Sequence, residues 1–167
     1  GRAAICVEQN ATYANLIEEA IRPYRGQEPL TTIIQADSRN LECIADDSVQ
    51  LVVTSPPYWN KADYGESPNN VGGSEGYLEF LENIRPVFEE CARVLQPGRK
   101  FCVVTANVNQ YTEYGLLNFP LAADFILLAR EIGLLLTSEV IWSKDGTGGK
   151  WGSYGVQRPI FGSYPYP

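Results

Sequence analysis

The sequence predicts an α/β fold with an open, mostly parallel sheet flanked by helices. Short apolar or β-branched runs alternate with amphipathic stretches, and polar residues follow each run where an expected strand stops. Hydrophobic residues make up 44% of the 167 residues, which is enough apolar mass for a core. The apolar runs are much shorter than the ~20 residues that a bilayer crossing needs. We therefore expect a single domain over residues 1–167 with no transmembrane span.

Each expected element follows from a local pattern. Five runs are apolar or β-branched, which is typical of strands. They span residues 3–8, 31–36, 49–54, 101–105 and 134–142. Four stretches carry apolar residues at helical spacing. They span residues 13–21 after a capping Asn10, a short helical turn at 41–45, a long helix at 76–95 that Pro97-Gly98 should stop, and 120–132. Residues 144–167 are expected to form a loop-like tail.

Charge and composition exclude several classes of chemistry. Lys and Arg number 13 against 20 Asp and Glu, a net charge of −7, and the chain has no histidine. Mechanisms that need an imidazole base, and most catalytic zinc sites, are thereby excluded. The four cysteines are far apart without a C-x-x-C pair, which is typical of reduced thiols in an intracellular protein. We expect no metal site and a cytoplasmic location.

The polar residues at the expected strand ends are the first candidates for a site, because ligands of open α/β sheets bind at the carboxyl ends of strands. Glu8 ends the first strand, where a carboxylate can accept hydrogen bonds from ribose hydroxyls. Alternatively, Glu8 is only a charged strand end or an acid that favours the helix N-terminus. Asp37 and Ser38 follow the second strand, and Asp37 could instead cap the next helix.

The third strand is followed by Ser55, two prolines, Tyr58 and Trp59. Consecutive prolines fix an extended turn and remove two N–H groups, which leaves carbonyls to accept hydrogen bonds from an amine. The aromatic pair offers a flat face on which a base can stack. The alternative is a rigid surface turn with two exposed rings. That alternative explains the prolines but not the aromatic pair at the carboxyl end of a strand.

The Ser-Pro-Pro-Tyr sequence at 55–58 resembles the catalytic motif of the S-adenosylmethionine-dependent DNA amino-methyltransferases. Other segments that resemble this family follow its order along the chain. They are residues 1–8, 59–60, 63–65, 91–98 and 140–144. The resemblance implies a Rossmann-like class I methyltransferase fold, with a mostly parallel sheet. Ser55 together with Trp59 is more similar to the cytosine N4 branch than to the adenine N6 branch.

The resemblance also implies a cofactor, a substrate and a role for each matching residue. S-adenosylmethionine would be the cofactor and double-stranded DNA the substrate. The implied catalytic residues are Ser55, Pro56, Pro57 and Tyr58. The implied cofactor-binding residues are Glu8 on the ribose, Asp37 and Ser38 on the adenine, and Ser55. The implied substrate-binding residues are Tyr58, which would stack on a flipped base, Trp59 and Lys144.

Two features depart from the family pattern. The chain has no glycine-rich F-x-G-x-G cofactor loop, so we expect an incomplete domain whose loop lies in a longer parent chain or comes from another copy. A net charge of −7 is also unfavourable for binding a phosphate backbone. Within residues 143–167, however, Lys144, Lys150 and Arg158 stand against Asp145 alone.

Several alternatives remain open on the sequence. Adenine N6 could be the methylated position, or a methyltransferase of this fold could act on RNA or on a protein amide. The chain could also be a non-catalytic remnant that binds cofactor or DNA. A nicotinamide-dependent enzyme is disfavoured because the chain has no G-x-G-x-x-G. For the leading hypothesis we expect a DNA-associated protein of prokaryotic or phage-like origin.

Overall fold

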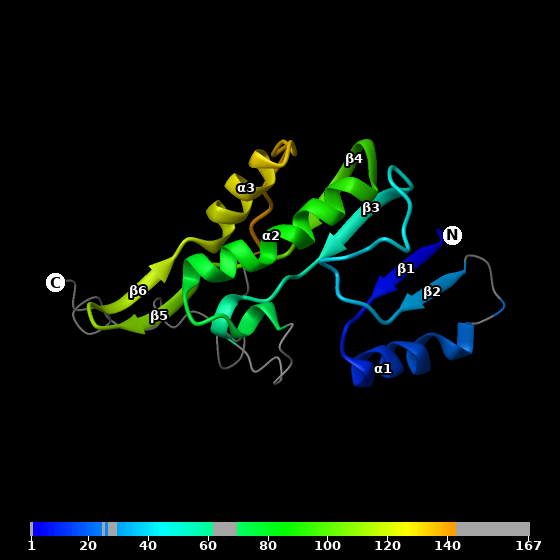
Figure 1. Cartoon of the computed structure of the whole chain (residues 1–167), viewed down its shortest axis with the longest axis horizontal. Coiled ribbons are helices and arrows are strands. Elements are labelled where there is room, and N and C mark those ends of the chain that lie inside the picture. Colours follow the sequence, from blue (N-terminus) through cyan, green and yellow to red (C-terminus); the bar gives the residue numbers. More distant parts are fainter. Residues whose placement is uncertain (1, 25, 27–29, 62–69, 143–167) are drawn as a thin grey trace. The chain divides into compact units, whose positions relative to one another are not determined.

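The computed structural model describes residues 2–24, 26, 30–61 and 70–142. The chain divides into two compact units, one formed by Gly1–Thr105 and one that begins at Ala106. The fold is α/β, with parallel strand pairs and helices, as the sequence predicts (Figure 1). No helix among the described residues is both long enough and apolar enough to cross a membrane.

The first unit opens with a strand, helix and strand. Strand β1 (Ala4–Val7) pairs in parallel with β2 (Thr31–Ile34), and helix α1 (Ala11–Ile21) connects them with a 3₁₀ turn at its end. The predicted cap is confirmed, because the side-chain oxygen of Asn10 accepts a hydrogen bond from the Thr12 amide at 2.9 Å. This capped helix start fixes where β1 ends and the chain turns away.

The second half of the first unit repeats the parallel pairing. Strand β3 (Val49–Thr54) pairs with β4 (Leu95–Val103), and helix α2 (Tyr77–Val94) lies between them in sequence. The helix buries one apolar stripe, as its spacing predicts. That stripe consists of Phe80, Ile84, Phe88, Cys91 and Val94. The rings of Phe88 and of Phe101 in β4 pack edge to face, with their centroids 5.1 Å apart, and this contact packs the helix against the strand.

One apolar cluster joins the two strand pairs. Leu41, Ile44 and Val94 are its buried members. Partly buried residues from three strands pack against them, namely Val7, Ile34, Val49 and Val52. The segment between β2 and β3 is therefore part of the core of this unit.

The second unit contains a hairpin and a helix. Strands β5 (Val108–Thr112) and β6 (Gly115–Phe119) are antiparallel, and α3 (Leu121–Glu131) follows. Its buried residues are Val108, Leu121, Phe125 and Leu128. The helix ends before Gly133, whose φ of 92° is a left-handed conformation that glycine adopts without strain.

Three predicted elements differ in the structure. Residues 41–45 form a single turn, in which the Ile44 amide donates a hydrogen bond to the Leu41 carbonyl at 2.7 Å. The turn does not continue into a helix because a side chain of α2 bonds its backbone. Helix α2 ends at Val94, as predicted within one residue, but the next strand begins at Leu95 and not at Phe101, so Pro97 and Gly98 lie within β4, where the pairing is irregular and Gly98 has a φ of 75°. The expected strand at 134–142 is not a strand in the structure, which assigns no regular element to these residues.

The strands also do not form the single open sheet that the sequence suggests. The described strands form three two-stranded sheets, and the hairpin of β5 and β6 was not predicted. Strands exist through their pairing, which apolar runs alone do not specify. Among residues 134–142, Leu135 and Val140 are 81% and 88% exposed, as expected of a segment outside the described sheets.

Candidate active site

Glu8 and Asp37 follow neighbouring parallel strands at their carboxyl ends. The ladder continues beyond β1 and β2, because the Glu8 amide donates to the Ile34 carbonyl at 3.1 Å and the Ala36 amide donates to the Glu8 carbonyl at 3.2 Å. Asp37 is the next residue along the chain. The structure thus brings two predicted cofactor-binding acids to one end of one strand pair, and both are partly buried.

The carboxylate of Glu8 is held by a local bond. Its Oε1 accepts a hydrogen bond at 2.8 Å from the amide of Asn10, the residue that caps α1. Among the described residues, no donor contacts its Oε2. The helix-end role and the ligand role are therefore compatible, because one oxygen serves the helix and the other is left for a ligand.

The carboxylate of Asp37 is held by Arg39. Oδ1 accepts from the Arg39 amide at 2.9 Å, and the guanidinium donates to both oxygens, with its closest contact at 2.6 Å. Hydrogen bonding from the Arg39 side chain lowers the pKa of Asp37 below its ordinary value, although burial opposes this. Asp37 is thus a charged acceptor, and Ser38 beside it is partly buried.

The Ser-Pro-Pro-Tyr segment begins directly after Thr54, the last residue of β3. The Ser55 hydroxyl lies 3.2 Å from the Tyr58 hydroxyl, which in turn donates to the Val104 carbonyl at 3.4 Å. Pro56 is buried and Pro57 partly buried. The predicted catalytic residues therefore lie together at the carboxyl ends of β3 and β4, with the tyrosine turned back toward the strand ends.

Trp59 is a buried anchor behind the motif. It is 6% exposed, and its Nε1 donates to the Ser74 carbonyl at 3.0 Å. Its ring packs edge to face against the ring of Tyr77, with the centroids 5.4 Å apart. Its φ of 49° is unusual for an aromatic residue and is maintained by this packing. The aromatic pair is thus one partly exposed ring, Tyr58, and one buried ring, Trp59. The predicted contact of Trp59 with a base stays a prediction.

Ser74 connects the motif to α2, a role that the sequence analysis missed. Its hydroxyl donates to the Val71 carbonyl at 2.9 Å and accepts from Asn83 of α2 at 3.0 Å, while its carbonyl receives the Trp59 ring nitrogen. The only local signal was a serine shortly before a helix, which is equally typical of a cap. Its partners come from two separate segments, which local patterns do not indicate.

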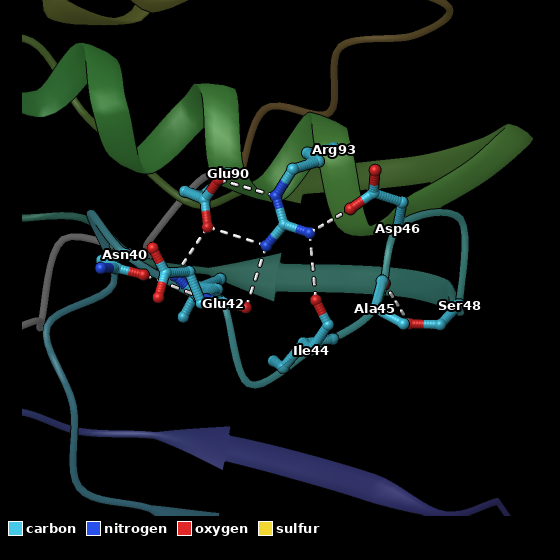
Figure 2. Close-up of polar contacts among 9 residues, drawn as sticks. Asn40, Glu42, Ile44, Ala45, Asp46, Ser48, Glu90 and Arg93 are labelled. Carbon is cyan, nitrogen blue, oxygen red and sulfur yellow. Dashed lines mark hydrogen bonds and ion pairs between the residues drawn. The ribbon is translucent and has the colours of Figure 1, made fainter.

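A second missed feature is the arginine that holds the segment between Asp37 and β3. Figure 2 shows the Arg93 guanidinium between Glu90 and Asp46, with one nitrogen directed at the Ile44 carbonyl. Arg93 donates to Ile44 at 3.0 Å and to the Leu41 carbonyl at 2.9 Å. The Leu41 amide donates to Glu90 at 2.6 Å. The spacing of Glu90 and Arg93 predicts a helix pair, but not their backbone partners.

Electrostatics agree with this network. Hydrogen bonding from Arg93 lowers the pKa of Glu90, and hydrogen bonds to Glu90 and Asp46 raise the pKa of Arg93. An arginine fork that satisfies backbone carbonyls and two carboxylates fixes a segment without regular structure. The Arg93 guanidinium therefore supplies hydrogen bonds that a helix would otherwise supply to backbone carbonyls within residues 40–48.

Lys61, two residues after Trp59, is not among the predicted site residues. It is partly buried, its amide donates to the Tyr58 carbonyl at 3.3 Å, and burial lowers the pKa of its side chain. Lys144 and residues 63–65 lie outside the described residues. Within the described part of the chain, no group of three or more acidic or cysteine side chains could hold a metal ion.

Comparison with known proteins defines the class. The N6_N4_Mtase family of DNA methylases matches residues 49–159, which include the Ser-Pro-Pro-Tyr segment. The chain therefore belongs to this DNA methylase family.

Individual relatives agree with the family match. The chain is 32% identical over 119 residues to the type II beta methyltransferase M.BslI of Bacillus sp. (strain NEB-606), covering 67% of this chain and 12% of the relative. It is 25% identical over 125 residues to the type II methyltransferase M.MjaVI of Methanocaldococcus jannaschii. That match covers 74% of this chain and 60% of the relative. The chain thus spans only part of these relatives.

Among solved structures, the chain is similar to TTHA0409 of Thermus thermophilus, described as a putative DNA modification methylase and solved in complex with S-adenosyl-L-methionine. The identity is 36% and the TM-score is 0.47, over 59% of this chain and 39% of that one.

Proposed function

We propose that this chain transfers a methyl group from S-adenosylmethionine to the exocyclic amine of a base in double-stranded DNA, with cytosine N4 favoured over adenine N6. The observation that carries the proposal is the Ser-Pro-Pro-Tyr segment at the carboxyl end of β3 in a member of the DNA methylase family. Within that segment, the Ser55 and Tyr58 hydroxyls lie 3.2 Å apart.

The residues at the strand ends fit the adenosine part of the proposed cofactor. Its two ribose hydroxyls and its exocyclic amine are donors, and Glu8 and Asp37 are acceptors on adjoining strands. Thr105, shortly after β4, has a buried hydroxyl without a hydrogen-bond partner among the described residues. Because such groups are normally satisfied, this hydroxyl supports a polar ligand near the carboxyl end of β4. Glu8 would hold the ribose, and Asp37 with Ser38 the adenine.

The residues of the motif can position an amine without a basic side chain. When bound, the cofactor supplies a methyl group on a positively charged sulfur. The Ser55 hydroxyl and the Pro56 carbonyl would accept the two amine hydrogens, so that the nitrogen lone pair faces the methyl group. The nitrogen gains the methyl group as the bond from sulfur to carbon breaks, and the amine releases one proton to water. Tyr58 would stack on the flipped base.

Cytosine is favoured because Ser55 together with Trp59 resembles the cytosine N4 branch of the family more than the adenine N6 branch. The chain would be incubated with duplex DNA and S-adenosylmethionine, and the DNA then hydrolysed to nucleosides. N4-methylcytosine supports the full proposal, whereas N6-methyladenine keeps the reaction but changes the base. Cofactor binding without either product would instead identify a non-catalytic remnant of the fold.

Cofactor binding is tested separately by calorimetric titration with S-adenosylmethionine. We expect Glu8→Ala to weaken binding at least about tenfold, in line with the loss of a charged hydrogen bond. Glu19→Ala is the matched control, because Glu19 is an exposed acid on α1. Equal affinities of the Glu8 and Glu19 variants would contradict the assignment of Glu8 to the ribose.

A further inference from the structure

The carboxylate of Asp37 is largely occupied within the chain. Oδ1 accepts from the Arg39 amide at 2.9 Å and from Nε at 3.1 Å, and Oδ2 accepts from Nε at 3.0 Å and from a terminal nitrogen at 2.6 Å. A carboxylate offers about four acceptor positions. The Nε hydrogen is shared between the two oxygens, so three hydrogens of Arg39 cover most of the acceptor capacity that a donor on a ligand would need.

Glu8 on the neighbouring strand end differs in this respect. Its Oε1 accepts one bond from Asn10, and no described donor contacts its Oε2. A ligand can thus reach the free oxygen of Glu8 without rearrangement, whereas at Asp37 it must share or displace the hydrogen bonds that Arg39 makes to both oxygens. The two acids of the proposed cofactor site therefore differ in how much of their hydrogen-bonding capacity is left for a ligand.

The guanidinium is the part of Arg39 that can leave. The bond from the Arg39 amide closes a local turn and orients Asp37 by itself. The ion pair is partly exposed, with side-chain exposures of 28% for Arg39 and 29% for Asp37. Partly exposed ion pairs are weak, so a ligand donor can displace the guanidinium at modest cost.

We propose that Arg39 sets the affinity of the site, because its guanidinium competes with the exocyclic amine of the cofactor's adenine for the oxygens of Asp37. This inference rests on the proposed function, since it needs the adenine to contact Asp37. Arg39 is not required to orient Asp37, and its removal frees acceptor positions. Affinity for amine-bearing cofactors should therefore rise when the guanidinium is absent.

The experiment is a calorimetric comparison of two ligands. The first is S-adenosylhomocysteine, and the second is its purine analogue, in which hydrogen replaces the 6-amino group. Arg39→Met keeps the apolar stem and removes every guanidinium donor. We expect it to tighten S-adenosylhomocysteine binding about two- to fivefold and to leave the analogue unchanged. The control Arg22→Met removes the same charge from an exposed site and should change neither affinity.

A third variant tests the route of the effect. In Asp37→Ala, the added Arg39→Met substitution should no longer tighten binding, because the acceptor oxygens for which the two donors compete are gone. Tightening that persists in the Asp37→Ala background would overturn the proposal.

The outcomes separate this inference from the proposed function. If the wild-type chain binds S-adenosylhomocysteine but Arg39→Met binds it equally or more weakly, competition is wrong and the proposed function stands. If both ligands tighten equally, the effect is one of general charge, and competition for Asp37 is again wrong. If neither the wild type nor the variant binds, the proposed cofactor site fails and the inference fails with it. If Arg39→Met binds S-adenosylhomocysteine and the wild type does not, the result supports both the proposed cofactor site and the competition for Asp37.

Discussion

The two strand ends of the candidate site are held in opposite ways. At β1 and β2, Glu8 and Asp37 are each fixed by a partner two residues away. After β3, Trp59 is fixed by a partner 15 residues away and Tyr58 by one 46 residues away. The acids of the proposed cofactor site are thus placed by local geometry, whereas the catalytic segment depends on distant parts of the fold. Damage to the core should therefore affect the catalytic segment first.

The largest effect is expected at Trp59. Trp59→Ala should lower the free energy of unfolding by about 3–5 kcal/mol, because it empties a buried ring site and leaves the Ser74 carbonyl without its donor. Urea unfolding measures this loss. Tyr13→Ala is the control, since Tyr13 is an aromatic residue with 57% exposure in the same unit. A loss as small as that of the control would contradict the anchor role.

The same variant sharpens the comparison between the two strand ends. Under conditions where Trp59→Ala is still folded, we expect methyl transfer to fall sharply while the affinity for S-adenosylmethionine stays close to that of the wild type. An equal loss of both properties would mean that the two strand ends are coupled.

The next largest loss is expected at Arg93. Arg93→Met leaves the Leu41 and Ile44 carbonyls without their donor and leaves Glu90 without its cation. Its midpoint in urea should lie between those of Trp59→Ala and the wild type. Arg99→Met removes an equal charge from an exposed position of β4 and should unfold like the wild type. Identical midpoints for the two arginine variants would show that the fork is not needed.

Sequence patterns predict the locally determined part of the molecule well. The Asn10 cap, the apolar stripe of α2 and the positions of Glu8 and Asp37 all follow from patterns of residues close in sequence, and the structure has them as expected. The roles of Ser74 and Arg93 were missed because their partners come from distant segments. Trp59 was expected to face a ligand because its type and position in the motif carry no sign of its burial.

A smaller effect concerns acid stability. The Arg93 hydrogen bond lowers the pKa of Glu90 from its ordinary value of about 4.5 in the folded chain. The unfolded chain then binds the proton more tightly, so this contribution to stability is complete above pH 4.5 and is lost as the pH falls through the lowered folded value. We expect it to be about 1 kcal/mol or less.

Urea midpoints between about pH 7 and about pH 3 test this contribution, since that range brackets the ordinary pKa of a glutamate. Glu90→Gln should show a shallower loss of stability toward low pH than the wild type. Glu89→Gln, at an exposed position on the same helix, should follow the wild-type curve. A Glu90→Gln curve parallel to that of the wild type would remove Glu90 from the acid response.

The smallest effect is expected from the Tyr58 hydroxyl. Tyr58→Phe removes contacts of 3.2 Å to Ser55 and 3.4 Å to the Val104 carbonyl, both long for hydroxyl hydrogen bonds, so stability should change by less than about 1 kcal/mol. If the ring stacks on a flipped base, Tyr58→Phe keeps most of the transfer rate, whereas Tyr58→Ala loses about tenfold or more through the missing stacking energy. Single-turnover rates on duplex DNA distinguish the two variants. Equal losses in both would assign the role of Tyr58 to its hydroxyl, and the local link between Ser55 and Tyr58 would then matter more than the distant contacts that hold the segment.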